Sequence, residues 1–208
     1  MAVNCTRPTE LTDISKVLCA VHFGQIVRLA FRRRLGVTAP AFATEAAMKT
    51  QAAWNSAITA EGNDKIILSP LFVNFVIPPS EAQFLEENTN GSINGKGYLA
   101  GYNAVKPTGE FVGLPGDVKA QLELIEEEAR AELGEDPMEQ WGITADNRII
   151  SVGAAGIPFS NFYIGSVGSE GFRALNKNAF GFSLDGKWDK GLTVTQAEFD
   201  LVNLYPAP

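Results

Sequence analysis

The chain has 208 residues, of which 45% are hydrophobic and 20% are charged, and its formal net charge is −7. This composition is typical of a folded globular protein and excludes wholesale disorder, and the length predicts one domain over residues 1–208. The negative charge argues against broad nonspecific binding to nucleic acid or to an anionic membrane. The charge is uneven, however, because residues 1–50 carry seven Lys and Arg against three Asp and Glu.

The first residues show no targeting signal. They lack the positive region followed by an apolar run that marks a signal peptide, and the apolar stretches of the chain are too short to cross a bilayer. We therefore expect a soluble protein that is made in the cytoplasm and has no membrane partner. In that compartment Cys5 and Cys19, the two cysteines, are expected to be reduced thiols.

The segment around Gly24 is rich in Val, Leu, Ile and Phe. These residue types favour strands, which we predict over residues 17–23 and 25–31, with Gly24 as a turn or bulge between them. A helix over residues 26–34 is the alternative.

The next segment changes from helical to β composition. Alanines favour a helix over residues 44–60, which Thr44 is placed to cap and Gly62 to end. Strands are predicted on both sides of Pro70, over residues 65–69 and 71–77. Proline lacks a ladder donor, so Pro70 marks an edge, a bulge or a crossing between sheets.

Residues 80–116 predict an extended loop or arm inserted in the domain. They are rich in Gly, Asn and Pro, show little periodicity, and are longer than connections in compact domains usually are. Such a segment is expected to be held by contacts with another subunit. The candidate contact residues are its large apolar side chains, Tyr98, Leu99, Tyr102 and Phe111.

The stretch "GDVKAQLELIEEEARAELGED" predicts an amphipathic helix from Asp117 to Gly134. Its apolar residues recur at steps of four and three and form one stripe, which is expected to lie on a core or on a neighbour. The stripe consists of Val118, Leu122, Ile125, Ala129 and Leu133.

The last third of the chain is β in character. Strands are predicted within residues 147–153 and 159–167, and a hairpin around Asp185-Gly186 with strands 178–184 and 192–201. The predicted fold class is α+β and β-rich, a β-sandwich or half-barrel with a flanking amphipathic helix and a long inserted loop. Its aromatic residues are interpreted as core.

Groups with catalytic potential are few. Residues 95–101 space their glycines as GxGxxxG, one residue too long for the dinucleotide fingerprint, and no strong helix follows. His22 is the single histidine and lies in an apolar run, so neither a Ser-His-Asp triad nor a Cys/His zinc site is indicated. The glutamates of residues 123–132 are typical of a solvated helix face. We expect no enzymatic activity, no cofactor and no metal.

A basic cluster near the start of the chain has two interpretations. Guanidinium groups suit phosphate oxygens, so the cluster is a candidate contact for DNA or for an acidic partner. Alternatively, the arginines pair with the chain's own acidic residues. The cluster consists of Arg28, Arg32, Arg33 and Arg34.

The order of β segments, long arm, single helix and further β segments resembles the tail-tube and head-to-tail connector ring proteins of tailed bacteriophages. The final segment "FGFSLDGKWDKGLTVTQAEFDL" carries this resemblance, and "KIILSPLFVNFVIPPSEAQF" is similar in style to virion proteins of phages that infect Bacteroidetes. The resemblance covers residues 60–205.

The resemblance implies a non-enzymatic virion subunit that is made in the host bacterial cytoplasm. Such a subunit closes into a ring or tube with copies of itself, contacts other virion proteins, lets DNA pass, and stacks its loop on the next ring. No catalytic residues are carried over from the family. The arginine cluster departs from the acidic lumen that such tubes often present. The alternative is a monomeric binding module or small enzyme that uses the long loop as a lid.

Overall fold

The computed structural model describes residues 26–34, 40–87, 96–130, 136–169, 171 and 175–205. The β-rich α+β class predicted from the sequence is confirmed. The predicted strand over residues 17–23, with Gly24, His22 and both cysteines, lies outside the described residues. The elements in chain order are β1 (Ile26–Arg33), the 3-10 helix η2 (Ala47–Lys49), α1 (Gln51–Ile58), the 3-10 helix η3 (Gly62–Asp64), β2 (Ile67–Leu68), β3 (Val73–Val76), β4 (Ala82–Glu87), β5 (Lys96–Tyr102), β6 (Thr108–Val112), α2 (Gly116–Glu128), β7 (Met138–Thr144), β8 (Arg148–Val152), β9 (Ile157–Gly168), β10 (Lys177–Ser183) and β11 (Leu192–Gln196).

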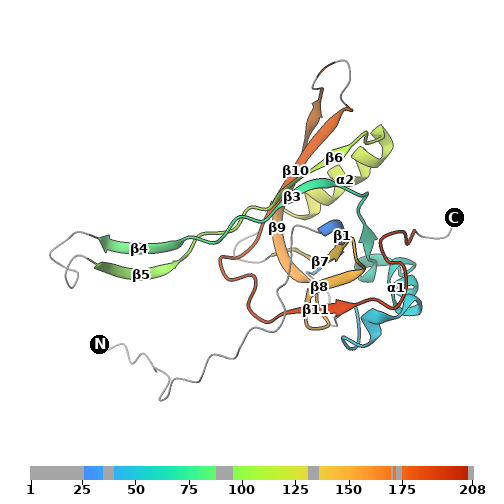
Figure 1. The fold of residues 1–208 in the computed structure, drawn as a ribbon, viewed down its shortest axis with the longest axis horizontal. Helices are drawn as coiled ribbons and strands as arrows, with labels where there is room; N and C mark the ends of the chain where they lie inside the picture. Colours follow the sequence, from blue (N-terminus) through green and yellow to red (C-terminus); the bar gives the residue numbers. More distant parts are fainter. Residues whose placement is uncertain are drawn as a thin grey trace.

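Most of the strands belong to one large antiparallel sheet with the order β11-β8-β7-β9-β10-β6-β3, while β4 and β5 pair only with each other (Figure 1). Strand β7 is the centre of one half, because β1 pairs along its whole length and β8 and β9 share its other edge. Strand β2 pairs with β1. The sheet therefore has a central strand that is covered on both edges.

Strand β9 joins the two halves of the sheet. Its first residues pair with β7, and the rest, from Ser160 onward, pair with β10. Asn161 has a φ of 52° at this transition, a left-handed conformation that Asn adopts more readily than most residues. The bend folds the β10-β6-β3 half over the β1-β7-β8 half and creates the sandwich-like core between them.

The main core lies between the two halves of the sheet. Because successive residues of a strand point to opposite faces, Leu29 and Phe31 of β1 enter this core while Ala30 points to the other face. Phenylalanines from both halves meet here, and Phe111 of β6 stacks on Phe180 of β10 with ring centroids 4.5 Å apart. The interpretation of the aromatic residues near the C-terminal end as core is confirmed for four phenylalanines, Phe159, Phe162, Phe180 and Phe182. Tyr163 is exposed, Trp188 is half-buried, and Phe172 lies outside the described residues.

A second core covers the outer face of the β1-β7-β8 half. Trp141 and Ile143 of β7 pack here against Trp54 of α1, and the segment that follows β11 closes the layer with Leu201 and Leu204. Trp54 also donates its indole N–H to the carbonyl of Met48 at 2.8 Å. Strands β1 and β7 are thus buried on both faces, although β1 contains three arginines.

Helix α2 lies along β9 and covers the open side of the main core (Figure 1). The predicted stripe is confirmed for Leu122, Ile125 and Ala129, which are buried, and Val118 is half-buried. The helix ends at Glu128, before the predicted Gly134, and residues 131–135 lie outside the described part. None of the described helices is long and apolar enough to span a bilayer.

Residues 44–77 form helix and strands in the predicted order, but each element is shorter than predicted. The helix predicted from Thr44 is a 3-10 turn followed by α1, because Thr50 is extended and interrupts it. Strands β2 and β3 are shorter than predicted. Pro70 marks a crossing, as one of its interpretations held, since β2 pairs with β1 and β3 pairs with β6.

The β segments differ from the sequence analysis in three places. Residues 80–116, predicted as an extended loop or arm, contain the strands β4, β5 and β6. Residues 138–144 form the fully buried β7, which the sequence analysis did not assign. The predicted hairpin between residues 178–184 and 192–201 does not form, because β10 pairs with β6 and β9 whereas β11 pairs with β8.

Candidate functional site

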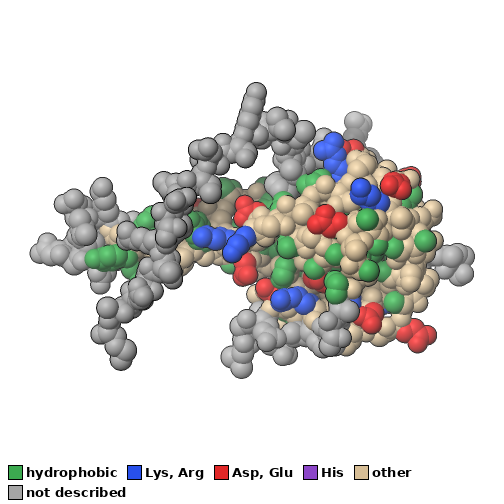
Figure 2. All heavy atoms as spheres, turned by 90° about the horizontal axis from the view of Figure 1, so that it is seen from below, with side chains coloured by type: hydrophobic (Ala, Val, Ile, Leu, Met, Phe, Trp, Pro, Cys, Tyr) green, Lys and Arg blue, Asp and Glu red, His purple; other side chains and the backbone are tan. Residues whose placement is uncertain are grey.

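Strands β4 and β5 form an arm, the two-stranded hairpin of residues 82–102, which projects from the body (Figure 1). Phe84 lies opposite Leu99, and Leu85 lies opposite Tyr98. Cross-strand partners share a face and neighbours along a strand alternate, so each face of the arm carries one of these pairs. The four side chains are between 48 and 60% exposed, and Figure 2 shows hydrophobic side chains along the arm at the left of the view.

The root of the arm is fixed to the body. Asn103 donates its backbone N–H to the carbonyl of Glu81 at 2.8 Å, and its side-chain oxygen accepts a hydrogen bond from Gln83. Gly186 lies so close to Tyr102 that an added Cβ would be 2.5 Å from the Cβ of that residue. The ammonium of Lys187 sits over the Tyr102 ring, 4.6 Å from its centroid. The connection after β10 therefore holds the arm at a defined position.

The predicted contact residues separate into two groups. Tyr98, Leu99 and Tyr102 lie on the arm with exposed side chains, so their role in subunit contacts stays a prediction. Phe111 is not available for such a contact, because it is 1% exposed and packs in the main core of its own subunit. The sequence analysis missed Phe84 and Leu85. Their signal was two short apolar runs flanking the turn-forming residues "NTNGSING".

The arginine cluster does not form a basic surface. Arg28 and Arg32 are 1 and 3% exposed, so the prediction that they contact DNA or the surface of an acidic partner protein is wrong. They point into the molecule because β1 is buried on both faces. Arg33 instead pairs with Glu128 of α2, and Arg34 donates a hydrogen bond to the carbonyl of Asp136 at 3.4 Å. The alternative, pairing with the chain's own acidic residues, is observed for Arg32 and Arg33.

Arg32 of β1 forms a buried ion pair with Glu139 of β7 and a second ion pair with the exposed Asp64 of η3. Its Nη1 lies 3.1 Å from Oε1 of Glu139, and its Nη2 lies 2.6 Å from Oδ1 of Asp64. Glu139 also accepts a hydrogen bond from the N–H of Gly156 at 3.1 Å. Burial raises the pKa of Glu139, although the charge of Arg32 and the bond from Gly156 oppose that shift. The ion pair with Arg32 and the hydrogen bond from Gly156 satisfy the buried Glu139, which allows β7 to occupy the centre of the sheet although it begins Met-Glu-Gln.

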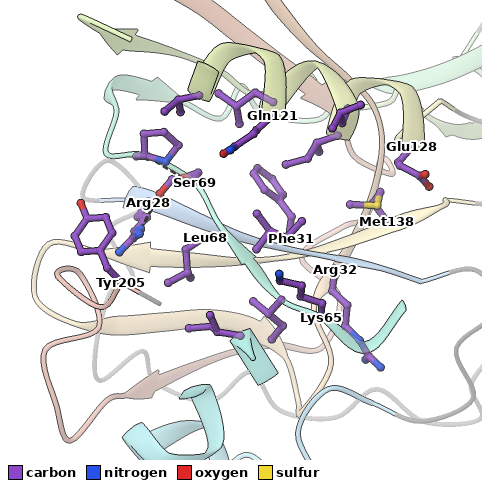
Figure 3. A pocket seen from close by; sticks show the side chains of 18 of the residues that line it. Arg28, Phe31, Arg32, Lys65, Leu68, Ser69, Gln121, Glu128, Met138 and Tyr205 are labelled. Atoms are coloured by element: carbon purple, nitrogen blue, oxygen red, sulfur yellow. Dashed lines mark hydrogen bonds between the residues drawn. The ribbon is translucent and has the colours of Figure 1, made fainter. Parts of the chain in front are cut away.

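A groove with a volume of about 970 Å³ lies between α2 and the β1-β2 edge (Figure 3). Its lining is predominantly apolar and includes Phe31, Ile67, Leu122 and Met138. Arg28, Ser69 and Tyr205 lie together at one end, and Glu128 lies at the other. Volumes of this size are typical of small-molecule sites. Nothing in the sequence indicated the groove, because its walls come from segments far apart in the chain.

The described part of the chain shows no cluster of metal-ligating side chains. No three residues among its His, Cys, Asp and Glu gather as ligands for a metal ion. The glutamates of α2 include Glu126, which is half-buried and accepts a hydrogen bond from the N–H of Ile164 at 3.2 Å. That contact attaches α2 to β9 and gives Glu126 a structural role.

Comparisons of the chain with protein-family models, with curated protein sequences and with solved structures find no match.

Proposed function

We propose that this chain is a non-enzymatic bacteriophage virion subunit that assembles with copies of itself into a ring or tube for DNA passage. The observation that carries the proposal is the arm, which exposes large apolar side chains on both of its faces. A two-stranded hairpin has marginal stability by itself in water, and exposed apolar patches mark interaction sites. The arm is therefore stabilised when another subunit covers it.

The shape of the subunit supports a head-to-tail assembly. The arm lies at one end of the molecule (Figure 1), and we propose that it contacts a different surface of the next copy, which makes the contact heterologous. Heterologous contacts repeat head to tail and generate closed rings or open tubes. The resemblance to tail-tube and connector proteins favours the same architecture and a place in the virion, with other virion proteins as further partners.

The inward position of two arginines removes one objection to a tube. Tube proteins of this kind often have an acidic lumen, and a basic surface formed by the arginine cluster would not fit one. Arg28 and Arg32, however, do not reach the surface. The net charge of −7 then suits a lumen that does not retain DNA.

The lid alternative predicts that the arm covers a pocket of its own subunit. The lining of the groove contains no residue of β4 or β5 among those described, and the arm projects away from α2 (Figure 1). Assembly therefore accounts for the arm better than a lid does.

The proposal is tested by replacing residues 83–101 with a short Gly/Ser link. The parent should form rings or stacks in light scattering and negative-stain imaging, whereas the shortened protein should stay a folded monomer with an unchanged circular dichroism melting curve. A parent that is monomeric at every concentration would sink the proposal, as would a shortened protein that assembles like the parent.

A further inference from the structure

The two buried arginines of β1 have different surroundings. Arg32 has two carboxylate partners, Glu139 and Asp64. Arg28 is on the same strand, four residues earlier, and is buried as deeply, but it forms no ion pair within the described residues. A buried charge normally has a partner of opposite charge, because the loss of its hydration is otherwise not replaced.

The bonds of Arg28 leave part of its guanidinium unused. Its Nε donates to the carbonyl of Ser69 at 2.7 Å, and its Nη1 donates to the carbonyls of Val202 and Leu204 at 2.8 and 2.7 Å. The Tyr205 ring covers one side, with its centroid 4.6 Å from Cζ. Nη2 has no acceptor among the described residues. Burial lowers the pKa of Arg28, as expected for a cation whose lost hydration is only partly replaced.

Arg28 lies at one end of the groove, and the remainder of the groove is apolar (Figure 3). At the opposite end Arg33 pairs with Glu128, whereas Arg28 has no carboxylate partner among the described residues. Lys65 also lines the groove, but its side chain is exposed to water. The stretch of α2 from Val118 to Glu128 spans roughly 15 Å at 1.5 Å per residue, comparable to an extended dodecyl chain. The mouth carries exposed apolar side chains at Ile67 and Leu124.

We propose that this groove binds a straight-chain alkyl monocarboxylate, with the carboxylate beside Arg28 and the alkyl chain between α2 and β2. A carboxylate at Nη2 forms a charge-assisted hydrogen bond and supplies the charge that Arg28 lacks. The alkyl chain covers the apolar stripe of α2 and the side chain of Ile67. This binding role is independent of the arm and of assembly, because no described residue of the arm lines the groove.

The test measures binding to the full-length protein by titration calorimetry, with decanoate, dodecanoate and decanol below their aggregation limits. Decanoate should bind saturably with one molecule per chain, and decanol at least about tenfold more weakly, because it lacks the charge-assisted bond. Dodecanoate should bind roughly fifteenfold more tightly than decanoate, since each buried methylene contributes about fourfold.

Variants separate the charged end from the apolar walls. Arg28→Gln should reduce decanoate binding to the level of decanol and leave decanol binding unchanged, whereas Ile67→Glu should abolish binding of both. Leu175→Glu is the matched control, because Leu175 is exposed and lies outside the groove, and it should change neither.

Equal binding of decanoate and decanol by the parent, or no saturable binding at all, would overturn the proposal. So would parental decanoate binding by a folded Arg28→Gln protein, which would show that Arg28 serves only to hold residues 202–205 in place. If Arg28→Gln does not fold, the proposal is tested by two results: tighter binding of decanoate than of decanol by the parent, and loss of binding of both by Ile67→Glu.

Discussion

The two faces of the arm can be tested separately by substituting one cross-strand pair at a time. One variant carries Phe84→Ser and Leu99→Ser, and the other carries Leu85→Ser and Tyr98→Ser. The two residues of a pair share a face because they are direct cross-strand partners. The two pairs lie on opposite faces because adjacent residues of a strand alternate between faces. All four side chains are about half exposed, so the folded monomer should lose little stability, within about 0.5 kcal/mol.

The expected cost to assembly follows from the area that remains to be buried. Full burial of a large apolar side chain stabilises by about 1.5 to 3 kcal/mol, so covering the exposed half contributes roughly 1 kcal/mol. Two residues on one face then contribute about 2 kcal/mol, which is about 30-fold in the association constant. Substituting both faces should cost about 4 kcal/mol, or roughly a thousandfold.

Sedimentation velocity over a concentration series measures these shifts directly. Each single-face variant should need about 30-fold more protein for half assembly. Leu175→Ser, an exposed leucine outside the arm, should assemble like the parent. Parental assembly by both single-face variants would refute the reasoning, whereas loss from one face only would show that the arm lies flat on its neighbour.

Three further predictions concern the body. Burial raises the pKa of Glu139, so the folded state binds that proton more tightly than the unfolded state does. This contribution to stability is lost as pH rises from about 4.5 through the folded pKa, so in urea unfolding the stability of Glu139→Gln relative to the parent should increase with pH. A constant difference would contradict this. Phe111→Ala should lower the free energy of unfolding by about 3 to 5 kcal/mol, because it empties a core position; a loss below about 1 kcal/mol in chemical denaturation would place Phe111 outside the core. Gly186→Ala should displace Tyr102 and loosen the arm root, which limited proteolysis detects as faster cleavage within residues 82–102, and an unchanged cleavage rate would show that the contact does not fix the arm.

Periodicity predicted the elements whose buried positions are all occupied by apolar residues. The stripe of α2 was predictable because Leu122 and Ile125 recur at helical spacing. Strand β7 was not, because Glu139 and Gln140 look like surface residues. Glu139 is buried only because Arg32, more than one hundred positions earlier, pairs with it, and no local pattern carries that information.

The errors of pairing have the same origin. Asp185-Gly186 has the composition of a hairpin turn, but the strands on either side of it pair with β6, β8 and β9 instead of with each other. The arginine cluster was left with two interpretations, surface contact or pairing within the chain, because its composition alone does not show that its first members fall on the buried strand β1. The arm was located correctly by its length and composition, while its strands were hidden by glycines and asparagines.

The separation in sequence between β1 and β7 has a consequence for how the protein folds. Their register joins Arg33 to Met138 and Ile26 to Thr144, so the central pairing must wait until a long chain has been closed into a loop. Pairing of this kind is slow, whereas a local hairpin such as the arm forms within microseconds, about 1 to 10 of them. The apolar side chains of the arm are therefore exposed before the body has folded. Contacts between the exposed apolar arms of incompletely folded chains compete with folding, so the yield of folded protein should fall as the concentration of refolding chains rises.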